Sequence, residues 1–236
     1  MRPRTILAVG AHIGDMDLAA GPLLAQNVLD GGTSVLLALT PGERGHPRLG
    51  VAEYKEQKIA EAHTFAAGIG AEVIVYDDQS DGFLHCTDEL AARLARDIRT
   101  IRPELILAHW GRSMHTDHEQ ASLLAERARF LAGLPGWEED PDATDGTGRR
   151  HGVGQLLYTE NWEDADGFTA DRYAPVSDQA RDRWHEAIST QAFARGETYG
   201  FRYIDYYGAQ LITRGCLTRT SYAVALADSG HGLREV

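Results

Sequence analysis

The sequence has few basic residues, few cysteines and no long apolar run. Its 23 lysines and arginines are outnumbered by 35 aspartates and glutamates, which gives a net charge of −12. This charge, without a basic stripe carrying interleaved aromatic residues, excludes a broad surface for nucleic acid or polyphosphate. No segment approaches the roughly 20 consecutive apolar residues of a membrane span. We also expect no secretory signal, because polar residues return at His12.

The two cysteines, Cys86 and Cys216, fit no metal-binding or redox spacing. We therefore expect two buried, reduced thiols in a cytoplasmic protein. A hydrophobic content of 43% and a charged content of 25% are ordinary for a globular protein, and 236 residues suffice for a sizeable core. We predict a single domain over residues 1–236 and leave open whether it forms a homo-oligomer.

Strand-like and helix-like segments alternate over the first two-thirds of the chain, which is typical of a parallel sheet covered by helices. The predicted strands comprise residues 5–10, 34–39, 72–76, 105–109 and 155–159. The predicted helices comprise residues 15–29, 51–68, 88–101 and 117–131. The fold class is therefore predicted to be α/β, a Rossmann-like, mostly parallel sheet with helices on both faces and a C-terminal elaboration.

Three parts of the domain differ in composition. Residues 1–132 form the predicted core, and residues 133–154, rich in Gly, Pro, Asp and Glu, are predicted to be a surface loop. Residues 155–236 form the C-terminal part, with a helix capped by Ser177 and running to about Arg195, and another over residues 203–212. Its aromatic residues favour packing over a carbohydrate platform; they are Trp184, Phe193, Tyr199, Phe201, Tyr203, Tyr206 and Tyr207.

Two short clusters of potential metal ligands each follow a buried strand and open a helix. His12 and Asp15 follow the first strand, and His115, Asp117 and His118 follow the strand at residues 105–109. Taken separately, Asp15 is equally explained as a helix cap, and the histidine pair as a surface pair. Because ligand sites assemble at the carboxyl ends of strands in open α/β sheets, the coincidence favours a catalytic type of zinc site.

Other polar residues are less informative on spacing alone. Glu43 lies on a Gly-rich turn after the second strand, where the chain can approach a ligand closely. Asp81 is most simply part of a turn, and Lys58 a solvated charge on its helix. Four histidines without partner spacing are interpreted as structural; they are His63, His85, His109 and His151.

The order of motifs resembles the LmbE-like, or GlcNAc-phosphatidylinositol de-N-acetylase, family. AHIGDMDLAAG at residues 11–21 is similar to the family signature AHPDDExLGxG, and TPGERG at residues 40–45 to TxGExG. KxxE at residues 58–61, DG at 81–82 and HTDH at 115–118 follow in the family's order. The resemblance covers about residues 4–130 well and the C-terminal third loosely.

The resemblance implies that His12, Asp15 and His118 bind zinc or another divalent metal. It also implies that His115 stabilises an oxyanion and that Asp117 orients a histidine. The positions of Lys58 and Asp81 contact substrate in the family's sugar-processing members.

The family's catalytic aspartate is Gly14 in this chain. Asp17 lies about 200° round the helix from Asp15 and should point away from a metal. Glu43 is therefore the predicted replacement base. If the base were simply deleted, Gly14→Asp should restore it, provided that the backbone at this turn accepts an aspartate.

Two functions fit these residues. The first is a zinc-dependent hydrolase of an N-acyl amide, acting on a small N-acetyl amino-sugar-like molecule with an atypical or missing general base. The alternative is a metal-binding protein that has lost deacetylation and serves as a ligand-binding module or runs a different metal-assisted reaction.

Overall fold

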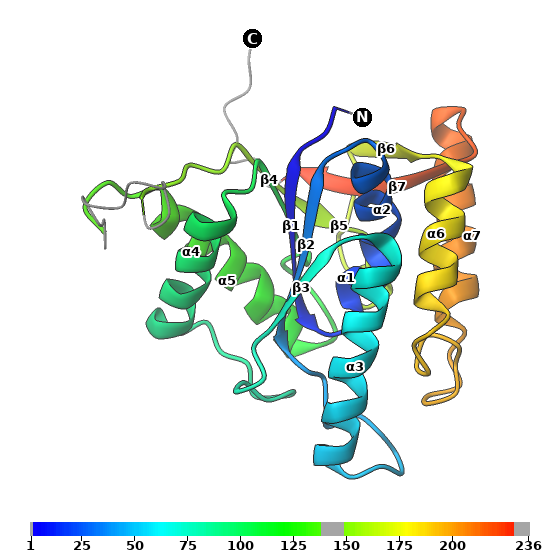
Figure 1. Ribbon diagram of the computed structural model, residues 1–236, viewed down its shortest axis with the longest axis horizontal. Helices are drawn as coiled ribbons and strands as arrows, with labels where there is room; N and C mark the ends of the chain where they lie inside the picture. Colours follow the sequence, from blue (N-terminus) through cyan, green and yellow to red (C-terminus); the bar gives the residue numbers. More distant parts are fainter. Residues whose placement is uncertain (1, 138–148, 229–236) are drawn as a thin grey trace.

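The structure is a computed structural model that describes residues 2–137 and 149–228 (Figure 1). One seven-stranded sheet has the order β3-β2-β1-β4-β5-β7-β6. The strands are β1 (Thr5–His12), β2 (Thr33–Thr40), β3 (Glu72–Val75), β4 (Leu105–Ala108), β5 (Gln155–Thr159), β6 (Arg172–Val176) and β7 (Tyr222–Asp228). Strands β1 to β5 pair in parallel, whereas β7 runs antiparallel to both β5 and β6. The predicted α/β class with a mostly parallel sheet is confirmed.

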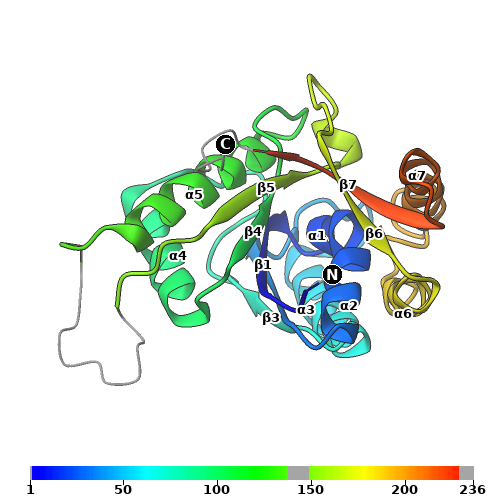
Figure 2. The same cartoon turned by 90° about the horizontal axis from the view of Figure 1, so that it is seen from above.

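Helices cover both faces of the sheet (Figures 1 and 2). They are α1 (Asp15–Ala19), α2 (Gly21–Leu29), α3 (Val51–Ile69), α4 (Asp88–Ile101), α5 (Thr116–Gly133), α6 (Asp178–Ile188) and α7 (Tyr203–Thr218), with a 3-10 turn η1 (Trp162–Asp164). Side chains of β1 alternate between two cores, because successive residues of a strand face opposite sides. Ile6 packs with α2, α3 and α6, and Leu7 packs with α4 and α5.

Several predicted boundaries differ from the structure. The predicted helix at residues 15–29 is divided at Ala20, where Pro22 lacks the N–H that a continuous helix needs. Helix α6 ends at Ile188 because the hydroxyls of Ser189 and Thr190 donate to its last carbonyls. Strands β6 and β7 were not predicted. Half of the predicted loop at residues 133–154, namely residues 138–148, lies outside the described residues.

The two cysteines are free, and their predicted burial is wrong. Cys86 is half-buried, and Cys216 is exposed near the end of α7. No helix within residues 2–137 and 149–228 has the length and apolar character to cross a bilayer.

The strand order creates a crevice at the carboxyl end of the sheet. The chain continues from β1 through β2 to β3 on one side, and then returns to place β4 on the other side of β1. Ligand sites of open α/β sheets form at such reversals of strand order. His12 ends β1, and His109 directly follows β4, so both lie at this crevice.

Candidate metal centre and active site

Three side chains from β1, α1 and α5 form the predicted ligand set. Asp15 Oδ2 lies 3.3 Å from His12 Nδ1 and 3.5 Å from His118 Nε2. The three donor atoms lie within 4.8 Å of one another. Two ligands about 2.1 Å from a tetrahedral ion are about 3.4 Å apart, so these separations suit one divalent metal.

The buried ring of His118 offers an unpartnered nitrogen to this set. Its Nδ1 lies 2.8 Å from Asp164 Oδ1, which fixes the Nδ1–H tautomer. Its Nε2 is buried and has no hydrogen-bond partner. Burial, together with the nearby charge of His109, lowers the pKa of His118 to about 4. The ring is therefore neutral at pH 7, as a metal ligand must be.

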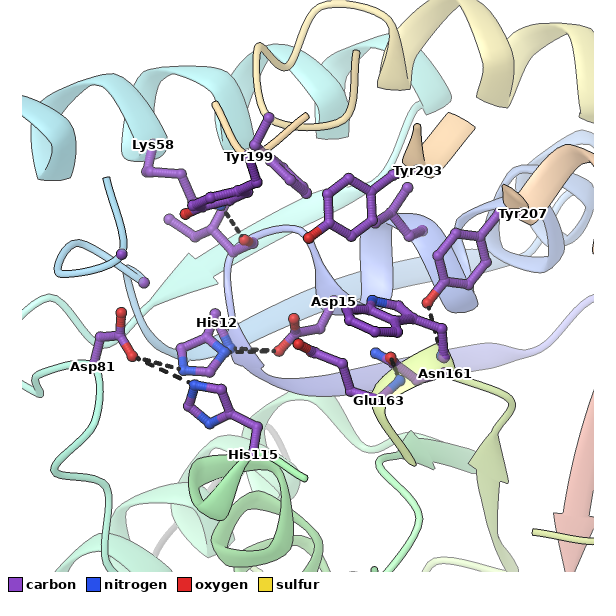
Figure 3. A pocket seen from close by; sticks show the side chains of 16 residues that line it. His12, Asp15, Lys58, Asp81, His115, Asn161, Glu163, Tyr199, Tyr203 and Tyr207 are labelled. Atoms are coloured by element: carbon purple, nitrogen blue, oxygen red, sulfur yellow. Dashed lines mark hydrogen bonds and ion pairs between the residues drawn. The ribbon is translucent and has the colours of Figure 1, made fainter. Parts of the chain in front are cut away.

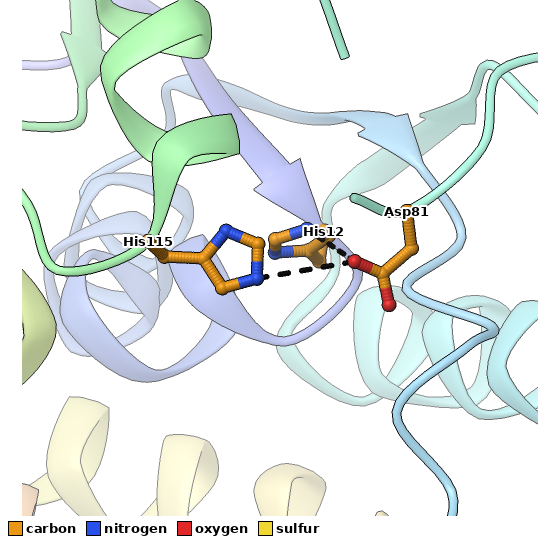
Figure 4. A group of neighbouring side chains, drawn as sticks. All are labelled: His12, Asp81 and His115. Atoms are coloured by element: carbon orange, nitrogen blue, oxygen red, sulfur yellow. Dashed lines mark ion pairs between the residues drawn. The ribbon is translucent and has the colours of Figure 1, made fainter. Parts of the chain in front are cut away.

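His12 faces Asp15 with one ring nitrogen and the carboxylates of Asp81 and Asp117 with the other. Figure 4 shows its pairing with Asp81. Its Nε2 lies 3.2 Å from Asp81 Oδ1 and 3.3 Å from Asp117 Oδ2. An Nε2–H donor shared by these carboxylates leaves Nδ1 free to face Asp15. Asp117 thus occupies the place that the predicted positioning role requires, and carboxylate partners of this kind fix the tautomer of a ligand histidine.

His115 is the N-cap of α5, and this fixes its tautomer as well. Its Nδ1 accepts a hydrogen bond of 3.2 Å from the backbone N–H of Asp117. The proton of a neutral ring is therefore on Nε2, which lies 3.9 Å from Asp81 Oδ1 at the pocket wall. A donor directed into the pocket is what stabilisation of an oxyanion needs.

His109 and Asp164 belong to the same centre, although His109 was interpreted as structural from the sequence and Asp164 was not predicted. The buried His109 ring stacks on His118 at 4.0 Å, and its Nε2 lies 3.1 Å from Asp15 Oδ2. Burial opposes its charge, but the charge of Asp164 and hydrogen bonds to Asp15 and Asp164 outweigh burial and raise its pKa to about 9. Asp164 therefore orients two histidines at once, through both of its oxygens.

Glu43, the predicted replacement base, has other partners. Its Oε1 accepts hydrogen bonds of 2.6 Å from the Ser80 hydroxyl and 3.3 Å from the backbone N–H of Asp81. The pocket wall includes Gly42 and Gly45 from the same loop but not Glu43. The structure thus favours a role for Glu43 in holding the segment that presents Asp81 to His12.

The carboxylate of Asp17 also points away from the ligand set, as predicted, and accepts a hydrogen bond of 2.6 Å from Gln191.

Position 14, where the resemblance implies an aspartate, does not suit a side chain in this backbone conformation. Gly14 has φ = 110°, which L side chains rarely adopt, and a Cβ built there would lie 2.3 Å from Phe193 Cζ. Lys58, predicted to be solvated, is instead buried, donates to the carbonyl of Ile13 and lies 4.0 Å above the Phe193 ring. An aromatic ring and an ammonium group thus fill the space beside Gly14, so the backbone condition on which Gly14→Asp was expected to restore a base is not met.

A pocket of about 370 Å³ opens over these residues (Figure 3). Its aromatic wall comes entirely from the C-terminal part and comprises Trp162, Phe193, Tyr199, Tyr203 and Tyr207. Four of these were predicted to serve packing, a role that the fully buried Trp184 does have.

Glu163 of η1 points toward Asp15 in this pocket. Burial, and then the charge of Asp15, raise its pKa to about 7.

The comparison with known families agrees with this geometry. Residues 7–129 match the family described as PIG-L: GlcNAc-PI de-N-acetylase, and the match includes all three residues of the ligand set. The chain belongs to the PIG-L family. The predicted resemblance is confirmed, because LmbE-like proteins are members of this family.

PIG-L relatives of this chain include both deacetylases and hydratases. It is 29% identical over 143 residues to 4-oxalmesaconate hydratase of Pseudomonas putida, covering 57% of this chain and 55% of that protein. It is 28% identical over 169 residues to 1D-myo-inositol 2-acetamido-2-deoxy-alpha-D-glucopyranoside deacetylase 1 of Catenulispora acidiphila, and the match covers 59% of this chain and 52% of that protein. The chain thus spans about half the length of these curated relatives. The crystal structure of GalB, the 4-carboxy-2-hydroxymuconate hydratase of Pseudomonas putida KT2440, superposes on this chain with a TM-score of 0.85 at 22% sequence identity. The superposition covers 100% of this chain and 99% of GalB, which shows a shared fold.

Proposed function

We propose that this PIG-L protein is a metal-dependent hydrolase that removes the acyl group from the amide of a small, neutral, N-acetyl amino-sugar-like molecule. The observation that carries the proposal is the ligand set itself, two imidazoles and a carboxylate facing one point beside an open pocket. Zinc suits this donor set. Another divalent metal in its place is the alternative, and metal analysis of the purified protein distinguishes the two. Bound there, such an ion would supply Lewis acidity toward a carbonyl oxygen and bring the pKa of water to about 7.

The chain's own residues would bind and orient the amide. His115 would donate from Nε2 to the developing oxyanion, a contribution of roughly two to three orders of magnitude in rate. Asp117, Asp81 and Asp164 would hold His12 and His118 in their tautomers. Lys58 and Asp81, both at the pocket wall, would contact substrate.

The character of the pocket favours a neutral substrate. Of the described residues at its wall, Lys58 is the only lysine or arginine, against the carboxylates of Asp15, Asp81 and Glu163. A polycarboxylate would meet repulsion from these groups until a metal offset part of their charge. The aromatic wall suits the apolar face of a sugar ring, and its tyrosine hydroxyls suit the ring's polar edge.

The test is acetate release from N-acetylglucosamine, its glycosides and N-acetylated thiol conjugates by the zinc-loaded protein. Release that a chelator abolishes supports the proposal. We also propose a cytoplasmic location, which the free cysteines agree with.

Hydration of a carbon–carbon double bond is the second candidate. It is favoured by the similarity to 4-oxalmesaconate hydratase and by a glycine, close to Phe193, at the position where the resemblance implies an aspartate. Conversion of 4-carboxy-2-hydroxymuconate without acetate release would select this candidate. Zinc binding with neither reaction would select the ligand-binding module.

A further inference from the structure

Glu163 is a carboxylate that the sequence motifs do not mark and that points into the site. It belongs to η1, the turn after β5, and its side chain lines the pocket beside Asp15. Its side chain is 23% exposed, and its Oε2 lies 3.5 Å from the unpartnered Nε2 of His118. The carboxylate is therefore open to the pocket and lies next to the atom that faces the metal position.

The backbone around Glu163 is fixed on both sides. Its N–H donates to Asn161 Oδ1 at 3.0 Å, and its carbonyl accepts from the N–H of Met114 at 3.1 Å and the hydroxyl of Ser113 at 3.2 Å. The next residue, Asp164, is held by His109 and His118. A carboxylate on so constrained a turn keeps its position when a ligand binds, as a group that moves a proton must.

Glu163 also lies just outside the ligand set. Within the described residues, the groups of mutually close donor atoms are His12/Asp15/His118, His12/Asp81/His115 and His109/His118/Asp164. Glu163 belongs to none of them, although it approaches His118. It is thus placed to reach a water molecule held at the ligand set rather than to complete the set.

We propose, on the basis of the hydrolase function above, that Glu163 is the general base that replaces the carboxylate missing at position 14. As the oxygen of water forms its bond to the amide carbon, Glu163 accepts one water proton. The protonated Glu163 then gives this proton to the departing nitrogen as the C–N bond breaks. The products are a carboxylic acid and an amine, so one water is consumed and the carboxylate of Glu163 is regenerated.

The experiment compares zinc-loaded wild type with Glu163→Gln, Glu163→Asp and the control Asp166→Asn. Asp166 lies on the same segment, but its side chain is 77% exposed. The first readouts are zinc content and the affinity for acetohydroxamic acid, which chelates a metal and gives its proton to an adjacent carboxylate, and neither readout requires a known substrate. We expect Glu163→Gln to retain one zinc per chain and to bind the hydroxamate about tenfold or more weakly, because a charged acceptor is lost. Glu163→Asp should recover part of this affinity, and Asp166→Asn should match wild type.

The second readout is hydrolysis of whichever N-acetylated compound wild type turns over. Glu163→Gln should lower kcat at least about a hundredfold with KM changed only a few-fold. Loss of zinc from Glu163→Gln would make Glu163 a ligand and overturn the proposal, as would unchanged hydroxamate affinity or unchanged kcat. If wild type hydrolyses none of the compounds, the hydrolase function fails, while the hydroxamate and zinc measurements still decide the placement of Glu163.

Discussion

Replacing Gly14 with a residue that has a side chain should destabilise the protein by more than the backbone strain alone explains. Gly14 has φ = 110°, so Gly14→Ala strains the backbone by about 1–3 kcal/mol. The new Cβ would also lie 2.3 Å from Phe193 Cζ, and overpacking of this kind typically adds about 1–3 kcal/mol. We expect a loss of about 3 kcal/mol or more in the free energy of unfolding. Gly14→Asp should lose at least as much and gain no activity.

Gly31 is a matched control because it has φ = 91° and a Cβ there would meet no atom within 4 Å. Gly31→Ala should therefore show the backbone strain alone. The excess cost of Gly14→Ala should largely disappear in a Phe193→Ala background, which removes the ring and by itself costs about 3–5 kcal/mol.

The assay is urea unfolding of the metal-free protein, with the variants compared by midpoint at equal slope. Equal costs for Gly14→Ala and Gly31→Ala would refute the packing argument, as would the same excess with and without Phe193.

Four further outcomes follow from the site. His118→Ala should abolish zinc binding, whereas His115→Ala should retain most of it; zinc content of the purified variants decides. Asp164→Asn should weaken zinc affinity by about 10–100-fold in chelator competition, because the ring of His118 loses its orienting partner. Glu43→Gln should change kcat less than about tenfold, because Glu43 binds Ser80 and Asp81 rather than substrate. A loss of about a hundredfold would instead indicate that Glu43 acts as the general base. Burial raises the pKa of Asp17 from 3.8 to about 6, so the folded state loses stability as the pH rises from about 4 to about 6 and no further above that range. Relative to wild type, Asp17→Asn should therefore gain up to about 3 kcal/mol between pH 4 and pH 7.5, and a constant difference in urea unfolding would contradict this.

Much of the fold could be predicted because its parallel strands are short apolar runs and α4 is strongly amphipathic. Helix α4 was predicted residue for residue, since Thr87 caps it and Pro103 follows its end. Strands β6 and β7 could not be predicted in this way. β6 contains Pro175 and has exposed residues, and β7 pairs with β5 from nearly 70 positions further along the chain. Their place depends on the sheet that the earlier strands build.

The ligand set followed from strand ends, but its surroundings did not. His109 carries the same strand-end signal as His12, yet it has no nearby partner in sequence and was interpreted as structural. Glu163 and Asp164 follow β5 in a segment that carries acidic residues at positions 160, 163, 164 and 166. The strand-end argument, applied to β5, would have identified this segment as part of the site. The conformation of Gly14 and its contact with Phe193 depend on tertiary packing across nearly 180 residues, which local patterns do not encode.

The most direct test of the account is a crystal structure of the zinc-loaded protein with anomalous scattering at the zinc edge. We expect one zinc site per chain, with His12 Nδ1, one Asp15 oxygen and His118 Nε2 about 2.0–2.2 Å from the ion and Glu163 outside this distance. A zinc ion held instead by His12, Asp81 and His115, or the absence of any zinc peak at these residues, would contradict it.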